Sequence, residues 1–190
     1  MRAFRSIALA ALAVACAGVG EPASAQSASP QWVRPEGALP RAARGDRAKN
    51  LDFLFEALKA APDQDAAKHV EHRIWALWFA SGSDTADLLM SRVKTAVEKG
   101  DADTALKLLD AVIELKPDFA EGWNQRAAVY FVKKDYGRAL ADLSQALARE
   151  PRHFGAWAGL GAILQDIGDE KRALDAYRHA LALYPQLPRI

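Results

Sequence analysis

The fold is decided by residues 123–151, which read WNQRAAVYFVKKDYGRALADLSQALAREP. Apolar residues recur through this stretch at intervals of three and four, which is the spacing of one face of an α-helix. Asp135 is of a residue type that caps the start of a helix, and Pro151 marks an end because proline cannot continue a helix. The stretch therefore predicts two helices joined by a short turn.

The pattern recurs every 34 residues through the second half of the chain. The recurring residues are Asp101, Asp135 and Asp169; Ala105, Ala139 and Ala173; Leu106, Leu140 and Leu174; Trp123 and Trp157; and Pro117, Pro151 and Pro185. Self-similarity at a fixed period is typical of stacked repeats, in which each unit buries its apolar face on the next. No segment alternates with a period of two for long enough to predict a strand. The sequence therefore predicts an all-α stack.

The repeat resembles the tetratricopeptide repeat, a helix–turn–helix unit of about 34 residues. Three full copies are predicted at residues 86–119, 120–153 and 154–187. The second copy matches the family pattern best, at Trp123, Ala127, Tyr130, Ala139, Leu143, Ala146 and Pro151. Residues 51–85 depart from the pattern and are predicted to form a degenerate leading repeat or N-terminal cap helices. The resemblance implies a short right-handed solenoid that binds a protein or peptide and has no catalytic activity.

The resemblance also implies where a partner binds, because in this family the first helices of successive repeats line a concave groove. The residues at the main groove positions are Met90, Lys94, Val97, Asn124, Ala128, Phe131 and Gln165, and those at the remaining positions are Asp87, Glu121, Gly155, Ala158 and Ala162. Met90, Val97 and Phe131 are apolar, which favours a binding surface over a solvated face. Lys94 is the one cation at positions where some relatives grip a terminal carboxylate, which disfavours that mode of binding.

The N-terminus predicts export from the cytoplasm. Residues 1–25 have a basic start, a short apolar run and the small-residue pattern Ala23-Ser24-Ala25, as in a cleaved signal peptide. Residues 26–50 contain three prolines and are predicted to be a flexible leader. These features predict a periplasmic protein. Cys16 leaves a second reading open, because the preceding Leu-Ala-Val-Ala resembles a lipoprotein cleavage box and would make the chain a lipid-anchored outer-membrane factor.

Composition excludes several classes of function. The formal net charge is +1, and removal of residues 1–25 would leave equal numbers of basic and acidic residues, whereas nucleic-acid binders normally carry a basic excess. There is no phosphate-binding glycine loop, cysteine pair or nucleophile motif, and the sequence predicts no cofactor. The alternative is a metal-binding or enzymatic role at Asp65, His69 and His72, which share one face of a predicted helix.

Three further expectations concern the repeats themselves. Arg126 is predicted to pack along its stem and to pair with a nearby carboxylate, and His153 is predicted to be a turn residue. The predicted last helix, at residues 169–183, has an apolar face that includes Leu174 and Leu181. Because such a helix can close the end of the stack by itself, the sequence favours a monomer.

Overall fold

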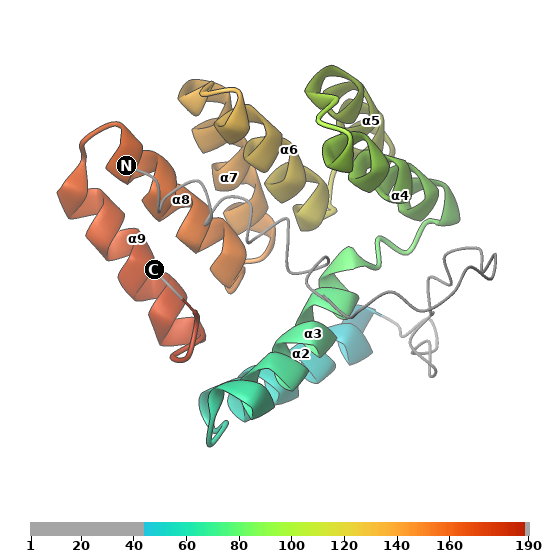
Figure 1. Cartoon of the computed structure of the whole chain (residues 1–190). Helices are drawn as coiled ribbons and strands as arrows, with labels where there is room; N and C mark the ends of the chain where they lie inside the picture. The colour runs from blue at the N-terminus through green and yellow to red at the C-terminus, as the bar shows by residue number, and fades with distance from the viewer. Residues whose placement is uncertain (1–43, 189–190) are drawn as a thin grey trace, which may run out of the picture.

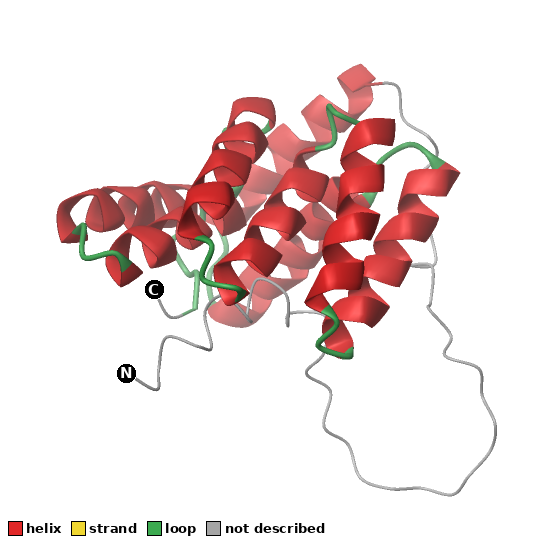
Figure 2. Cartoon of the chain, turned by 90° about the horizontal axis from the view of Figure 1, so that it is seen from above, coloured by secondary structure: helices red, strands yellow, loops and turns green. Residues whose placement is uncertain are grey.

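The computed structural model describes residues 44–188, which form eight helices and no strand. The helices are α2 (Arg44–Lys59), α3 (Gln64–Phe79), α4 (Asp84–Glu98), α5 (Ala102–Leu115), α6 (Ala120–Val132), α7 (Tyr136–Arg149), α8 (Phe154–Asp166) and α9 (Glu170–Leu183). The all-α prediction is confirmed, and Figure 2 shows helices joined by short loops. The predicted signal peptide and Cys16 lie outside the described residues. Residues 44–50, expected in the leader, instead begin α2, which no proline interrupts after Pro40.

The periodic aspartates begin the second helix of each of the pairs α4–α5, α6–α7 and α8–α9. Asp101, Asp135 and Asp169 each accept a hydrogen bond from the backbone N–H three residues further on, which satisfies a donor at the helix start. The turns before them place a residue in the left-handed region, with φ of 72° at Gly100 and 84° at Gly168. Lys134 holds the same region at φ 59°, where glycine would be less strained.

The helix pairs pack through small residues at fixed positions. Ala105 and Ala139 are completely buried, and Ala173 is nearly so, because each lies where the second helix of a pair crosses its neighbours. Arg126 joins three helices: its guanidinium donates two hydrogen bonds of 2.8 Å to Asp142 on α7 and one of 2.7 Å to Asp110 on α5. The hydrogen bonds to Asp142 are the largest cause that raises the pKa of this guanidinium above its ordinary value. The structural role predicted for Arg126 is confirmed.

A tyrosine packs between the two helices of the last pair, α8 and α9. Tyr177 lies against Gly161, and its hydroxyl donates a 2.9 Å hydrogen bond to Gln165. The buried face of α9 consists of Ala173, Ala176 and Ala180. Leu174 and Leu181, which we expected on that face, are 49% and 38% exposed. The expectation was wrong for these two leucines because the helix turns its alanines, not its leucines, toward α8.

We expect Gly161→Ala to destabilise the protein by about 1–3 kcal/mol through overpacking. A Cβ atom at this position would lie 2.4 Å from the Tyr177 ring, so the ring must leave its place on α8. Urea denaturation would measure the change in unfolding free energy. The control is Gly159→Ala, whose Cβ would meet Leu143 at an ordinary 3.7 Å. Equal stabilities of the two variants would contradict this account of the helix contact.

Helices α2 and α3 form a hairpin that does not continue the stack. Helices α4–α9 form an arc, and the hairpin lies across its open side (Figure 1). The hydrophobic cluster of the hairpin includes Phe154, the first residue of α8, and Tyr184, which follows α9. Among the described residues, this cluster contains none from α4, the next helix along the chain. The hairpin therefore joins the start of the described chain to the last repeat.

Candidate functional site

Two tryptophans of α3 cover the first turn of α8. Trp78 stacks on the His153 ring at 4.1 Å between centroids, and Trp75 meets the Phe154 ring edge-on at 5.6 Å. Trp75 also lies so close to Gly155 that an added Cβ atom would be 2.9 Å from its ring. Glycine at position 155 is therefore what allows the α3 helix to approach α8. The predicted groove position Gly155 is buried by the chain itself.

A buried polar network lies beneath these rings. The side chains of His153 and Glu121 are both fully buried, and 2.8 Å separates His153 Nε2 from Glu121 Oε2. His153 Nδ1 accepts a 3.0 Å hydrogen bond from the backbone N–H of Ala156, which makes His153 the N-cap of α8. This contact leaves the proton on Nε2, which donates to Glu121. Glu121 also accepts hydrogen bonds from Asn124 and Gln125, so its carboxylate is saturated with donors.

A second buried carboxylate fixes the hairpin to the C-terminal end. Glu71 on α3 accepts hydrogen bonds from Trp75 Nε1 at 3.1 Å and from the Tyr184 hydroxyl at 3.1 Å. Burial, with the Glu71 charge beside it, raises the pKa of Tyr184. Outside the core, Arg152 donates to Asp52 at 2.5 Å and lies over the Phe55 ring. Polar contacts thus reinforce the aromatic ones at both edges of the hairpin.

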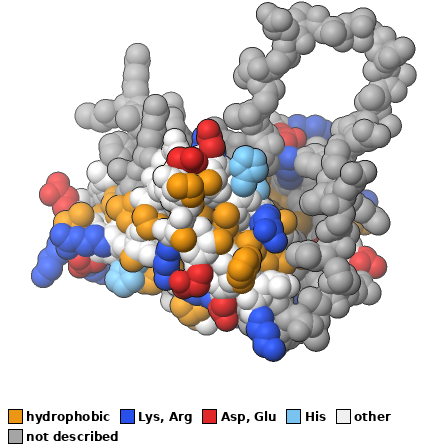
Figure 3. Space-filling model, turned by 90° about the horizontal axis from the view of Figure 1, so that it is seen from below, with side chains coloured by type: hydrophobic (Ala, Val, Ile, Leu, Met, Phe, Trp, Pro, Cys, Tyr) orange, Lys and Arg blue, Asp and Glu red, His pale blue; other side chains and the backbone are white. Residues whose placement is uncertain are grey.

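Among the described residues 44–188, the other half of the concave face is not covered by the hairpin. A small pocket between α6 and α8, with a cavity volume of about 40 Å³, is lined by Asn124, Ala127, Ala128, Phe131, Leu143, Gly155, Ala158, Gly159, Ala162 and Ile163. Nine of these ten residues are apolar or glycine, and most are small. The pocket can therefore receive a small apolar group, with the Asn124 amide as the polar group in its wall. On the side that carries the hairpin, apolar side chains also reach the surface among charged ones (Figure 3).

The structure brings together only part of the predicted groove. Asn124, Ala128 and Phe131 line the pocket, together with Gly155, Ala158 and Ala162 from the wider set. Met90 is only 8% exposed and packs in the core between repeats, Val97 packs at the edge of the same cluster, and Lys94 pairs with Glu98 at 3.7 Å. Gln165 is exposed and accepts the Tyr177 hydrogen bond outside the pocket. Contact of any of these residues with a partner stays a prediction.

The residues of the alternative metal site do not assemble. Asp65, His69 and His72 are all exposed, and His69 Nδ1 lies 2.7 Å from the backbone oxygen of Asp65 rather than from its carboxylate. Within residues 44–188, no group of three histidine, cysteine, aspartate or glutamate side chains is placed to hold a metal ion. In the same range, no helix is both long and apolar enough to cross a membrane.

Sequence reasoning did not predict what the two tryptophans contact, and it missed the buried polar pair. His153 is a turn residue, as predicted, but its ring is buried between Trp78 and Glu121. A signal was present, because Trp75 and Trp78 make α3 unusually aromatic for a helix expected at the exposed end of a stack. Glu121 carried no such signal, since glutamate is rarely fully buried and its position was expected to line the groove.

Comparisons with known proteins agree with this architecture. A family model described as the tetratricopeptide repeat protein 21 ARM repeat matches residues 7–155, and a tetratricopeptide repeat model matches residues 129–188. A TPR repeat-containing protein of Rhizobium etli is 42% identical over 72% of this chain and 67% of its own length. Protein bimA of Emericella nidulans is 31% identical over 45% of this chain, which spans only 10% of that protein.

A solved structure supports the fold as well. The Arabidopsis OM64 TPR domain matches with a TM-score of 0.54 and 21% identity, over 55% of this chain and 87% of that domain. Its likeness concerns the helical arrangement alone. With the 34-residue period, the capped helix pairs and the family matches taken together, the chain belongs to the tetratricopeptide repeat family.

Proposed function

We propose that this protein is a non-catalytic binding module that takes up an apolar side chain of a partner protein between α6 and α8. The pocket lined by Ala128, Phe131, Ala158 and Ala162 carries the proposal, because its small apolar residues leave room that residues 44–188 do not fill. The family is one of protein-interaction modules, and its concave face is the surface expected to bind.

The α2–α3 hairpin restricts how a partner can enter. Gly155 lies against the Trp75 ring, and Glu121 is buried and binds His153, on which Trp78 stacks, so the first turns of α6 and α8 are covered. A peptide extended along the whole concave face would meet the hairpin. The partner is therefore proposed to reach the pocket from the later turns of α6 and α8, where Phe131 and Ala162 lie.

The site is tested by comparing two neighbouring substitutions. We expect Phe131→Glu to weaken partner binding at least tenfold, because a carboxylate in an apolar pocket loses hydration without gaining a partner. Val132→Glu is the matched control, since Val132 is 61% exposed on the adjacent position of the same helix. A photo-crosslinking residue at Ala158 would report capture in the living cell, and circular dichroism would report folding. Equal capture by both folded variants would refute the site.

We also propose that the mature protein acts in the periplasm as a monomer. The basic start, apolar run and Ala23-Ser24-Ala25 pattern support cleavage after residue 25. The intact mass of the mature chain tests this directly, since it should begin at Gln26 and carry no lipid. A lipid on an N-terminal Cys16 would instead make the protein an outer-membrane lipoprotein, with the same pocket.

A further inference from the structure

We propose that the α2–α3 hairpin can dock on a second copy of this chain, so that the monomer is in equilibrium with a hairpin-exchanged dimer. The hairpin makes its core contacts far along the chain, with Phe154 and Tyr184. It is joined to α4 only by residues 80–83. If these residues straighten, the hairpin reaches the same surface on another copy and makes identical contacts there.

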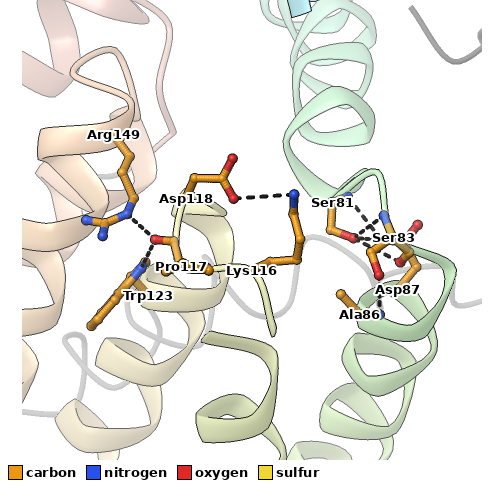
Figure 4. Close-up of polar contacts among 9 residues, drawn as sticks. All are labelled: Ser81, Ser83, Ala86, Asp87, Lys116, Pro117, Asp118, Trp123 and Arg149. Atoms are coloured by element: carbon orange, nitrogen blue, oxygen red, sulfur yellow. Dashed lines mark hydrogen bonds and ion pairs between the residues drawn. The ribbon is translucent and has the colours of Figure 1, made fainter. Parts of the chain in front are cut away.

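The short linker is held closed by a small set of hydrogen bonds. Asp87 accepts from the backbone N–H of Ser81 at 3.0 Å and from its hydroxyl at 2.5 Å. The backbone N–H of Ser83 donates to the Ser81 hydroxyl, and Ser83 in turn caps α4 through Ala86. Figure 4 shows these groups turned toward one another at the junction. Opening the linker costs these contacts, whereas exchange keeps all of the contacts between the hairpin and the rest of the fold.

Gly82 is the residue whose backbone conformation affects the equilibrium between the closed monomer and the exchanged dimer. Its φ is +77°, a region that L-residues rarely adopt, and a Cβ atom there would meet nothing within 4 Å. Alanine at position 82 therefore penalises only the closed backbone, by a factor of about 5 to 30 for a residue forced into the left-handed region. The exchanged dimer contains two linkers, and the strain at position 82 is relieved in both. The association constant of the alanine variant should therefore rise by about 30-fold or more.

The expected dissociation constants follow from the linker length. A short flexible linker supplies an effective concentration on the order of millimolar, and the unmodified protein should therefore be monomeric at micromolar concentration. For Gly82→Ala, we expect the dimer to form at a concentration about 30-fold lower than for the unmodified protein, as measured by size-exclusion chromatography with light scattering. Gly168→Ala is the matched control, because its φ is +84° and its Cβ would also meet nothing within 4 Å. That turn lies within a repeat, so the control should remain monomeric.

Cross-linking between two different copies identifies the contact. Gln186 donates a 2.7 Å hydrogen bond to the backbone oxygen of Ala61, which joins the C-terminal segment to the hairpin turn. With Cys16→Ser in both, one preparation carries Ala61→Cys and the other Gln186→Cys, each with Gly82→Ala. A bismaleimide reagent added to their mixture should join the two different copies. A closed monomer carries only one of the two cysteines, so it cannot form this cross-link within itself.

The outcomes separate exchange from other association. A monomeric, folded Gly82→Ala variant would overturn the proposal, and so would a dimer that yields no mixed cross-link. Equal dimerisation of Gly82→Ala and Gly168→Ala would show non-specific association and also overturn it. If Gly82→Ala does not fold, Asp87→Ala is the second variant, because it removes both hydrogen bonds to Ser81 and leaves the backbone unstrained. A folded Asp87→Ala variant that forms no more dimer than the unmodified chain would equally count against exchange.

Discussion

Glu121→Ala is expected to destabilise the protein by at least about 3 kcal/mol, because three buried donors would lose their acceptor at about 1–3 kcal/mol each. The donors are His153 Nε2 and the side-chain amides of Asn124 and Gln125, whose hydrogen bonds to Glu121 are all buried. Water does not reach the two fully buried side chains of Glu121 and His153, so the lost contacts are not replaced. Urea denaturation, monitored by circular dichroism, measures the loss.

Two further variants make this test specific. Glu121→Gln keeps one acceptor oxygen and should lie between the alanine variant and the unmodified protein. Glu114→Ala, on the exposed surface of α5, should stay within about 0.5 kcal/mol of the unmodified protein. A Glu121→Ala protein as stable as the Glu114→Ala protein would show that the buried network contributes nothing.

Trp78→Ala is expected to cost about 3–5 kcal/mol, the usual loss for removing a buried tryptophan. The ring is 4% exposed, stacks on His153 and packs against Phe154, so its removal leaves a cavity between the hairpin and α8. Thermal and urea unfolding would both report the loss. Hydrogen exchange would locate it, with faster exchange expected in α2 and α3.

Trp78→Phe provides the control for this second prediction. Trp78 Nε1 is the one buried side-chain nitrogen or oxygen among the described residues that has no hydrogen-bond partner. Phenylalanine removes this unpaired N–H and retains most of the ring contact, so it should cost much less than alanine. If phenylalanine and alanine destabilised the protein equally, the stacking on His153 would not be what holds the hairpin.

The repeats could be predicted from the sequence because each depends on nearby residues. Asp135 caps a helix within three residues, and Ala139 packs on the helix that directly precedes it. Periodicity repeats these local contacts along the chain, so a single sequence displays them several times. The pocket residues Ala128 and Phe131 followed from the same register.

The hairpin could not be placed in this way because its contacts occur once and span the chain. Asp52 pairs with Arg152, and Glu71 binds Tyr184, at separations of 100 and 113 residues. No period relates such residues. From the sequence alone, each charged residue could be solvated and each aromatic residue could belong to any part of the core. The burial of Met90 could not be predicted for a related reason: its groove position lies between repeats, which neither its residue type nor its spacing reveals.

The hairpin also determines how the molecule comes apart. A linear array of repeats loses its terminal units first, because each end unit has only one neighbour. In this chain the first described helices rest on the last repeat, and Gln186 is bound to the turn of the hairpin. Neither end can fray without disrupting the other, so heat should melt residues 44–188 in one cooperative transition, with no stepwise loss from the termini.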